Sequence, residues 1–477
     1  MTTTRWMRLN TAIAVLAGLV LRLYFVLKFP ATESGDGPFY IELASNWLKN
    51  HVYGAMVDGR LVPIDTRVPG YPAFLAAVFA IGGNTQRAVM LAQVLVDLAT
   101  CVVIAMIAAR LAPEHVRSRV MLAGLWLAAL CPFTANYTAI TLTETLVTFL
   151  TAAGLLVLLQ AAALEFAPAN ARANAVPTGV NPWFVAGIVG GFGALVRPET
   201  PLTLIAAGVV LLVLWRRPRD WTKLVRVGVL MGVGVLLPLV PWAARNWRTL
   251  HQVQFLAPRY ANLPSEIVPH GVNAWTGTWL WRFRDVYLTL WKFDDEAVPI
   301  DTIPPSAFDS ADERNRVAAI LAVYNDSTTL TPEIDRAFGG IARERTARHP
   351  LRTYIEIPFL RCVSMWFTPR VELLPYSGQI FPLRSEWHDD RRDLVVSVTL
   401  FAIGIIYAGL AVAGAWMSRK SPGWAVLVVF VIVRTVFFAT MVETPEPRYV
   451  LECFPAVIAL AAQVFAGRAQ LSSTGSG

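Results

Sequence analysis

The sequence contains little charge, few cysteines and few histidines. Only 16% of its 477 residues are charged and 55% are hydrophobic, whereas about 25% of an ordinary soluble domain is charged. The four cysteines are too few and too scattered for a disulfide framework. The six histidines show no ligand spacing and no acidic pair is placed to hold a divalent cation, so we expect no metal site and no cofactor. These shortages exclude the soluble and disulfide-stapled classes and predict a polytopic membrane protein.

Ten apolar runs are long enough to cross a membrane, which requires about 20 helical residues. They begin near Asn10, Ala88, Arg119, Leu142, Asn181, Pro201, Lys223, Leu394, Pro422 and Arg448. Arg5 and Arg8 precede the first run as in a secretory signal, but no small-residue cleavage site follows, so we expect this run to remain as a helix. The sequence therefore predicts an all-α membrane protein with about ten transmembrane helices.

Basic residues indicate how these helices are oriented, because loops rich in Lys and Arg stay in the cytoplasm. Such residues occur at the N-terminus, at 110–119, at 215–226, at 419–420 and at Arg468. The net charge of +8 therefore reflects topology, and no nucleic-acid partner is needed to explain it. With both termini inside, the loop after the first span faces outward. We expect a multi-pass protein of a bacterial plasma membrane whose site faces the periplasm.

The pattern of spans divides the chain into four regions. These are an N-terminal membrane module (1–245) with a first outer loop (30–87), an extracytoplasmic domain (246–392), C-terminal membrane helices (393–468) and a flexible tail (469–477). The first outer loop contains two helical segments, 38–50 and 71–83, that are too short to cross the membrane. We therefore expect both to lie in the outer interface.

The extracytoplasmic domain is predicted to be mostly helical. Two of its segments, 309–325 and 331–349, follow helix-start signals at 309–310 and 331–332. The next segment, 349–367, is aromatic and basic. We expect it to lie along the membrane surface.

Charged residues gather at the predicted outward ends of several spans. The set comprises Asp36, Arg67, Glu144, Arg197, Glu199, Arg245, Arg434, Glu443, Arg448 and Tyr449. Exposure to water explains any single one of them. As a set, several guanidinium groups around one Asp suit a lipid with a phosphate head, since Arg binds phosphate in a bidentate manner. Asp97 lies deeper in the second span, where we expect a hydrogen-bonded contact between helices.

Several segments resemble the integral-membrane GT-C glycosyltransferases of the protein O-mannosyltransferase and lipid A aminoarabinose transferase type. They are ESGDGPFYIELASNWL (33–48), RVPGYPAFLA (67–76), TLTETL (141–146), GALVRPE (193–199), PWAARNW (241–247) and EPRYVLECFPAVIALAA (446–462). RVPGYP and PWAARN are the more specific signals, although Val68 replaces a proline of the family pattern. The block from 250 to 392 matches only in general character.

The resemblance implies a fold, a reaction and a set of site residues. Members of this family take a sugar from a polyprenyl phosphate and pass it, with anomeric inversion, to an acceptor hydroxyl outside the membrane. The implied partners are a polyprenyl-phosphate-linked sugar, a lipid, glycan or protein acceptor, and membrane lipids. The implied catalytic base is Asp36, and the implied ligands of the donor phosphate are Arg67, Arg245, Arg448 and Arg197. Further substrate-binding candidates are Tyr40, Tyr71, Glu144, Arg434 and Tyr449.

Three other functions are weighed against this one. A polytopic transporter usually shows two related halves and broken helices at the midplane, and the sequence shows neither. An O-antigen ligase or polymerase would also have many spans and a large outer loop, but we would not expect an Asp in the first outer loop followed by RVPGYP. A purely structural membrane subunit would not explain why several arginines gather at the predicted outer ends of the spans.

Overall fold

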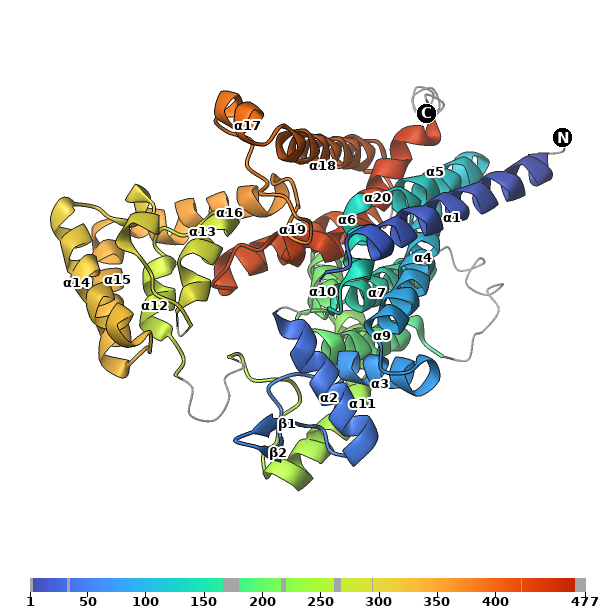
Figure 1. Ribbon diagram of the computed structural model, residues 1–477. Coiled ribbons are helices and arrows are strands. Elements are labelled where there is room, and N and C mark those ends of the chain that lie inside the picture. Colours follow the sequence, from blue (N-terminus) through green and yellow to red (C-terminus); the bar gives the residue numbers. More distant parts are fainter. Residues whose placement is uncertain are drawn as a thin grey trace. The chain divides into compact units, whose positions relative to one another are not determined.

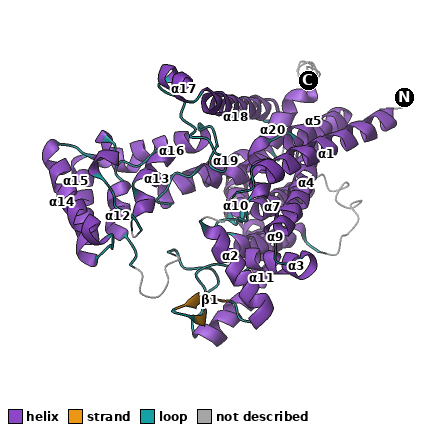
Figure 2. Ribbon diagram, viewed as in Figure 1, coloured by secondary structure: helices purple, strands orange, loops and turns teal. Residues whose placement is uncertain are grey.

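The computed structural model describes residues 3–31, 35–165, 180–215, 220–260, 267–293, 295–421 and 423–467. Helices make up most of this structure, with one short pair of strands (Figure 2). The chain forms two compact units, of which the first is Met1–Arg259, Pro369–Val433 and Leu451–Gly477, and the second is Tyr260–Thr368 and Arg434–Val450. These units are defined by compactness, so the predicted membrane and extracytoplasmic regions stay a prediction. Residues 166–179, the basic residues 216–219 and Arg468, and the predicted tail lie outside the described residues.

Long apolar helices dominate the first unit (Figure 1). Within the described residues, seven helices are long and apolar enough to cross a membrane. They are α1 (Thr3–Lys28), α4 (Gln86–Leu111), α7 (Glu144–Glu165), α11 (Trp221–Leu250), α18 (Arg391–Met417), α19 (Trp424–Met441) and a C-terminal run formed by η8 (Pro447–Cys453), α20 (Phe454–Ala461) and η9 (Ala462–Ala466). An eighth span is possible where η1 (Glu114–Val116) and α5 (Arg117–Ala129) meet α6 (Pro132–Asn136) and η2 (Tyr137–Ala139) at a bend of 44°.

Within the described residues, two of the ten predicted spans form helices that are shorter than expected. The runs near Asn181 and Pro201 form α9 (Pro182–Val196) and α10 (Leu202–Leu214), which have 15 and 13 residues. At 1.5 Å per residue each is about 20 Å long, which is less than the roughly 30 Å of a hydrocarbon core. The stretch RPETP at 197–201 separates them, and its prolines cannot continue a helix. Because α9 and α10 are consecutive, every other loop keeps its predicted side whether both cross or neither does.

Small residues let the membrane helices approach closely. A Cβ on Gly187 of α9 would lie 2.3 Å from the Met231 carbonyl oxygen of α11, and one on Gly191 would lie 2.5 Å from that of Val235. Such contacts are typical of helices that pack in lipid, where van der Waals fit replaces the hydrophobic effect. In Figure 1, α4, α7, α9 and α11 accordingly lie side by side.

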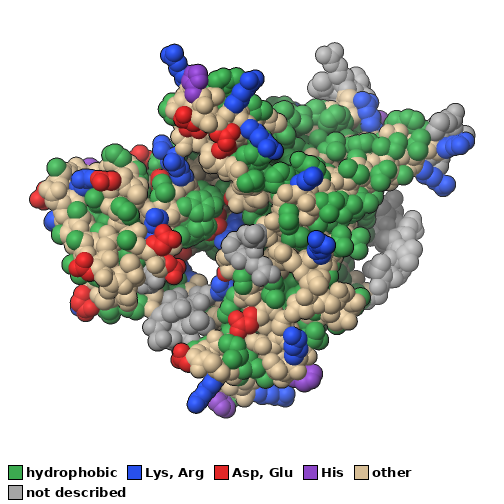
Figure 3. All heavy atoms as spheres, in the orientation of Figure 1, with side chains coloured by type: hydrophobic (Ala, Val, Ile, Leu, Met, Phe, Trp, Pro, Cys, Tyr) green, Lys and Arg blue, Asp and Glu red, His purple; other side chains and the backbone are tan. Residues whose placement is uncertain are grey.

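The outer surface of the first unit suits an apolar solvent. Figure 3 shows hydrophobic side chains over α1 and α5, with basic side chains at the N-terminal end of α1. On α1, Leu16, Val20 and Leu27 are 59%, 60% and 75% exposed. An unpartnered face of this kind would be costly in water, which supports a lipid environment.

The first outer loop contains both short helices that the sequence predicts, as α2 (Asp36–Asn50) and α3 (Gly70–Gly82). Between them is an unpredicted antiparallel hairpin of β1 (Gly54–Val57) and β2 (Arg60–Pro63), in register Gly54 to Pro63. Its two turn residues, Asp58 and Gly59, have φ values of 49° and 74°. An Asp-Gly pair is the preferred turn for such a hairpin, so the sequence did contain its signal.

The second unit is a helical body with its own core. It contains α12 (His270–Thr276), α13 (Phe283–Leu288), η4 (Leu290–Lys292), η5 (Ile300–Thr302), η6 (Pro305–Ala307), α14 (Ala311–Ser327), α15 (Pro332–Arg348), a π-helical turn η7 (Arg352–Glu356) and α16 (Ile357–Trp366). Trp275, Trp279, Tyr324 and Phe338 are the largest members of its buried cluster. The short helix α17 (Leu383–Asp389) belongs to the first unit.

The helix starts predicted in this second unit are confirmed. Ser310 accepts a hydrogen bond from the Glu313 amide at the start of α14, and Thr331 accepts one from the Ile334 amide at the start of α15. Each side chain satisfies a backbone donor that the first helical turn leaves without a partner. The position of the segment 349–367 relative to a membrane stays a prediction.

A fully buried ion pair locks three helices of the first unit. Arg22 of α1 donates from Nε to Oδ2 of Asp97 in α4 at 2.7 Å. Its Nη1 also donates to the Ala129 carbonyl oxygen of α5 at 2.8 Å. The expected contact of Asp97 between helices is thereby confirmed, although its partner Arg22 was not predicted.

Substitution of Asp97 by Leu should destabilise the protein strongly, because Arg22 would remain as an unpaired buried charge. Loss of one partner of a buried pair costs about 3 to 5 kcal/mol. We expect a lower midpoint of thermal unfolding for Asp97→Leu in detergent, and a smaller loss for the double variant Arg22→Leu/Asp97→Leu. A midpoint equal to that of wild type would show that the pair does not hold these helices together.

Candidate functional site

Asp36 and Arg67 form an ion pair within the segment 30–87, the predicted first outer loop. Asp36 is the first residue of α2, and its Oδ1 lies 2.8 Å from Nη2 of Arg67 in the turn before α3. Their side chains are 36% and 24% exposed, so both remain accessible. The structure therefore brings together the predicted base and the first predicted phosphate ligand.

Backbone constraints fix both partners of this pair. Gly35, directly before Asp36, has a φ of 68°, which favours glycine. Gly70, after the turn that contains Arg67, packs so closely on α9 that a Cβ would lie 2.5 Å from the Leu195 carbonyl oxygen. The Tyr53 hydroxyl donates to the Arg67 carbonyl oxygen at 2.9 Å. The turn is thus held by its sequence, by α9 and by the hairpin.

Electrostatics keep Arg67 cationic. Burial lowers the pKa of its guanidinium, but the Asp36 carboxylate and the Tyr40 hydroxyl more than offset this, so the pKa is raised above its ordinary value. The Arg67 guanidinium carbon also lies 5.6 Å from the centre of the Phe39 ring. A charged, half-buried guanidinium of this kind can bind an anion.

Tyr40 links this pair to a second group of charges. Burial raises the pKa of Tyr40 to about 12, and the charges of Asp36, Arg67, Arg197 and Glu144 also act on it. Tyr40 therefore lies within electrostatic range of four of the predicted site residues. All five belong to the first unit.

Tyr71 packs against Tyr40. The two rings meet edge to face with their centres 5.2 Å apart. Tyr71 is fully buried and donates to Oε1 of Gln93 at 2.8 Å. Gln93 in turn donates to the Ile140 carbonyl oxygen at 2.7 Å. Sequence reasoning missed Gln93, a polar residue within an apolar span that could have been noticed on that ground.

Arg197 bridges carboxylates from three segments. It lies 3.2 Å from Glu144 at the start of α7, 2.8 Å from Glu199, and 3.9 Å from Glu452 in η8. Glu144 and Glu452 are each 1% exposed, and Thr151 donates to Glu452. Glu452 was not among the predicted site residues, although an acid inside an apolar run is a signal for function.

Arg245 holds the two residues that flank the hairpin. It donates to the backbone carbonyl oxygens of Ile64 and Tyr53. Its guanidinium carbon lies 5.3 Å from the ring centre of Tyr53 and 5.1 Å from that of Trp242. Since Tyr53 contacts the Arg67 backbone, Arg245 helps to position Arg67.

The remaining predicted residues form a cluster of their own in the second unit. Arg434 is fully buried and donates to the Tyr449 carbonyl oxygen at 2.8 Å. Tyr449 donates from its hydroxyl to Oε1 of Glu446 at 2.7 Å, and Arg448 lies 2.6 Å from Oε2 of the same carboxylate. Glu446 was not predicted, and it joins Arg448 to Tyr449.

Comparison with known proteins identifies the fold. No family model and no curated protein matches the chain. The oligosaccharyltransferase AglB from Archaeoglobus fulgidus, tethered with an acceptor peptide, aligns at 12% identity and a TM-score of 0.52 over 97% of this chain and 49% of that one. The chain has the GT-C fold. The sequence-based prediction of an all-α membrane protein with this fold is therefore confirmed.

Two further solved structures are similar to this GT-C chain. AglB in complex with an inhibitory peptide and a dolichol-phosphate aligns at 12% identity and a TM-score of 0.50, over 96% of this chain and 50% of that one. ArnT from Cupriavidus metallidurans in the apo state aligns at 15% identity and a TM-score of 0.38, over 98% of this chain and 78% of that one. The chain spans about half the length of the archaeal enzyme.

Arg197→Met should destabilise the protein even without substrate, because three carboxylates would lose the cation that bridges them. We expect a loss of about 3 kcal/mol or more, as for other broken buried pairs, measured by thermal unfolding in detergent. Arg117→Met is the control, since Arg117 lies in an exposed pair 3.9 Å from Glu114 and such pairs contribute about 0 to 1 kcal/mol. Equal effects of both substitutions would contradict the bridging role.

Proposed function

We propose that this chain is an inverting glycosyltransferase that moves a sugar from a polyprenyl-phosphate donor to an acceptor hydroxyl. The ion pair between Asp36 and Arg67 carries the proposal, because it joins a carboxylate that can act as a base to a guanidinium that can bind phosphate. The GT-C fold supports the reaction class. The AglB structure with a dolichol-phosphate supports the class of the donor.

We place the reaction at the extracytoplasmic face of a bacterial plasma membrane. In support, the first outer loop precedes α4, while the basic residues Arg110, Arg117 and Arg119 lie at the other end of that helix. Basic loops remain in the cytoplasm. The acceptor is a hydroxyl of a lipid, a glycan or a protein.

The proposed chemistry is a single displacement. Asp36 takes the proton from the acceptor hydroxyl while the acceptor oxygen attacks the anomeric carbon of the sugar. The bond from that carbon to the phosphate oxygen breaks, and the departing phosphate keeps the electron pair. One displacement inverts the anomeric centre. Because a sugar phosphate already has a stable leaving group, one carboxylate is sufficient, in contrast to the two of a glycosidase.

Arg67 is proposed to stabilise the charge that develops on the departing phosphate. A guanidinium has five N–H donors in a planar fork. Arg67 uses Nη2 for Asp36 and Nη1 for a 3.2 Å bond to the Thr66 carbonyl oxygen, which leaves donor capacity for phosphate. Preorganised charge of this kind is usually a large contribution to catalysis.

The other predicted residues keep their proposed roles with different support. Tyr40 is within electrostatic range of Asp36 and Arg197 and is proposed to line the substrate site together with Tyr71. Arg197 and Glu144 lie 3.2 Å apart, and their roles in binding the donor phosphate and the substrate stay predictions. Arg245 is supported as a positioning residue for Arg67. The roles of Arg448 in binding the donor phosphate and of Arg434 and Tyr449 in substrate binding stay predictions.

Asp36→Asn should abolish most of the activity while it preserves donor binding, because the amide keeps the shape of the carboxylate but cannot accept the proton. Loss of a positioned base costs about 10² to 10⁴ in rate. The measurement is transfer of sugar from a polyprenyl-phosphate donor by purified protein, with donor affinity measured separately. Asp58→Asn, at the exposed hairpin turn of the same loop, is the control. Turnover near wild type for Asp36→Asn would refute the mechanism.

Arg67→Ala should weaken the affinity for polyprenyl phosphate by about ten- to a hundredfold, since a charge-assisted hydrogen bond contributes about 1.5 to 3 kcal/mol. Arg67→Lys should have an intermediate affinity because it keeps the charge and loses the planar fork. Arg60→Ala on β2, which changes the same charge at an exposed position, is the control. Unchanged affinity with lower turnover in Arg67→Ala would mean that Arg67 orients Asp36 and does not bind the phosphate.

A further inference from the structure

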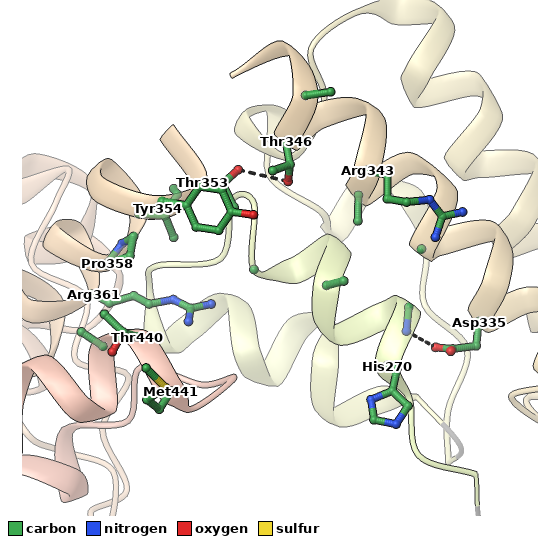
Figure 4. A pocket seen from close by; sticks show the side chains of 18 of the residues that line it. His270, Asp335, Arg343, Thr346, Thr353, Tyr354, Pro358, Arg361, Thr440 and Met441 are labelled. Atoms are coloured by element: carbon green, nitrogen blue, oxygen red, sulfur yellow. Dashed lines mark hydrogen bonds between the residues drawn. The ribbon is translucent and has the colours of Figure 1, made fainter. Parts of the chain in front are cut away.

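The second unit contains a large pocket that the proposed transfer reaction does not use. Its volume is about 1010 Å³, and it lies among α12, α15, the η7–α16 segment and the end of α19. Figure 4 shows the labelled side chains of these segments around it. Every lining residue belongs to the second unit.

Arg361 supplies this pocket with an unpartnered donor. The residue is 5% exposed, and its side chain extends from α16 toward the open centre of Figure 4. Its Nε donates to the Leu280 carbonyl oxygen at 2.8 Å and its Nη1 to that of Val442 at 3.1 Å. Its Nη2 is buried and has no hydrogen-bond partner among the described residues. Buried polar groups without partners are rare, and each one requires an explanation.

The charge of Arg361 is also poorly compensated. Burial lowers the pKa of its guanidinium to about 10, and the Glu443 carboxylate offsets this only in part. The group therefore stays cationic at neutral pH in surroundings that disfavour a charge. An anion that accepts from Nη2 would relieve both penalties.

Other lining residues favour an anion as well. Arg343 of α15 is exposed and forms no ion pair with the described part of the chain. The carboxylate of Asp335, which also lines the pocket, already has hydrogen-bond donors. Its Oδ1 accepts from the backbone amides of Gly271 and Val272 at 2.7 and 3.0 Å. Thr346 and Thr353 place two more hydroxyl groups at the rim, with their oxygens 3.4 Å apart.

An exposed apolar face adjoins the pocket. Leu351, Tyr354, Ile355 and Phe359 are 71%, 70%, 62% and 65% exposed. They follow one another at spacings of three, one and four residues along the η7–α16 segment, as on one face of a helix. Tyr354 also lines the pocket. A cluster of this kind beside a cationic pocket marks a surface that meets membrane lipid.

We propose that this pocket binds the phosphate headgroup of an anionic membrane lipid. A phosphate oxygen accepts from Nη2 of Arg361, Arg343 contacts the same headgroup, and the acyl chains lie along the apolar face of 351–359. This site is separate in its residues from Asp36 and Arg67, and it goes beyond the proposed transfer reaction. It gives the second unit its own attachment to the lipid surface.

The test is a binding titration of the full-length protein in detergent. The probes are a short-chain phosphatidylglycerol, a phosphatidylcholine with the same chains, and glycerol phosphate without chains. We expect tight binding of phosphatidylglycerol and at least tenfold weaker binding of the other two. Equal affinity for phosphatidylcholine would overturn the proposal, because no anion would be recognised. Equal affinity for glycerol phosphate would overturn the proposal as well, because the acyl chains of a lipid would contribute nothing to binding.

Amino-acid substitutions test whether the lipid binds in this pocket. Arg361→Gln and Arg343→Gln should each weaken phosphatidylglycerol binding by about tenfold or more. Arg314→Gln is the matched control, since Arg314 is an exposed arginine of the same unit that pairs with Asp301 outside this pocket. If Arg361→Gln fails to fold for want of its two carbonyl contacts, Arg343→Gln decides the outcome. Unchanged affinity in Arg343→Gln, or an equal loss in Arg67→Ala, would overturn the proposal.

Discussion

A charge among apolar helices must have a partner, and this constraint organises the first unit. Arg22 and Asp97 satisfy it by joining α1, α4 and α5 in one buried pair. Arg197 satisfies it by bridging Glu144, Glu199 and Glu452 at the junction of α7, α9 and the C-terminal run. In a medium of low dielectric constant these contacts are strong when complete and costly when broken. They fix which helices are neighbours.

The same constraint separates structural charges from charges that can react. Asp36 and Arg67 are 36% and 24% exposed, whereas Arg22, Glu144 and Glu452 are almost completely buried. A fully buried pair has no room for a substrate, but a half-exposed pair can exchange part of its contacts with one. The rigid support for this pair comes from neighbours that are themselves buried, namely Tyr53, Tyr71 and the backbone of α9.

The elements that follow from local pattern could be predicted from the sequence. The apolar runs predicted the long helices, and Ser310 and Thr331 predicted two helix starts. The segments ESGDGPFY and RVPGYP predicted the loop that contains Asp36 and Arg67. The partners of buried charges could not be predicted, because Arg22 and Asp97 are 75 residues apart and pairing depends on how helices pack. Glu452 and Gln93 could have been noticed as polar residues within apolar runs, but their partners could not be predicted. Two predicted spans form shorter helices than expected, because an apolar composition does not reveal where a helix ends.

The residues nearest the proposed chemistry occupy one short, continuous part of the chain. Asp36, Tyr40, Arg67 and Tyr71 all lie between the start of α2 and the end of α3, which are residues 36 and 82. One continuous segment of the chain therefore contains the proposed base, its cationic partner and the aromatic pair beside them.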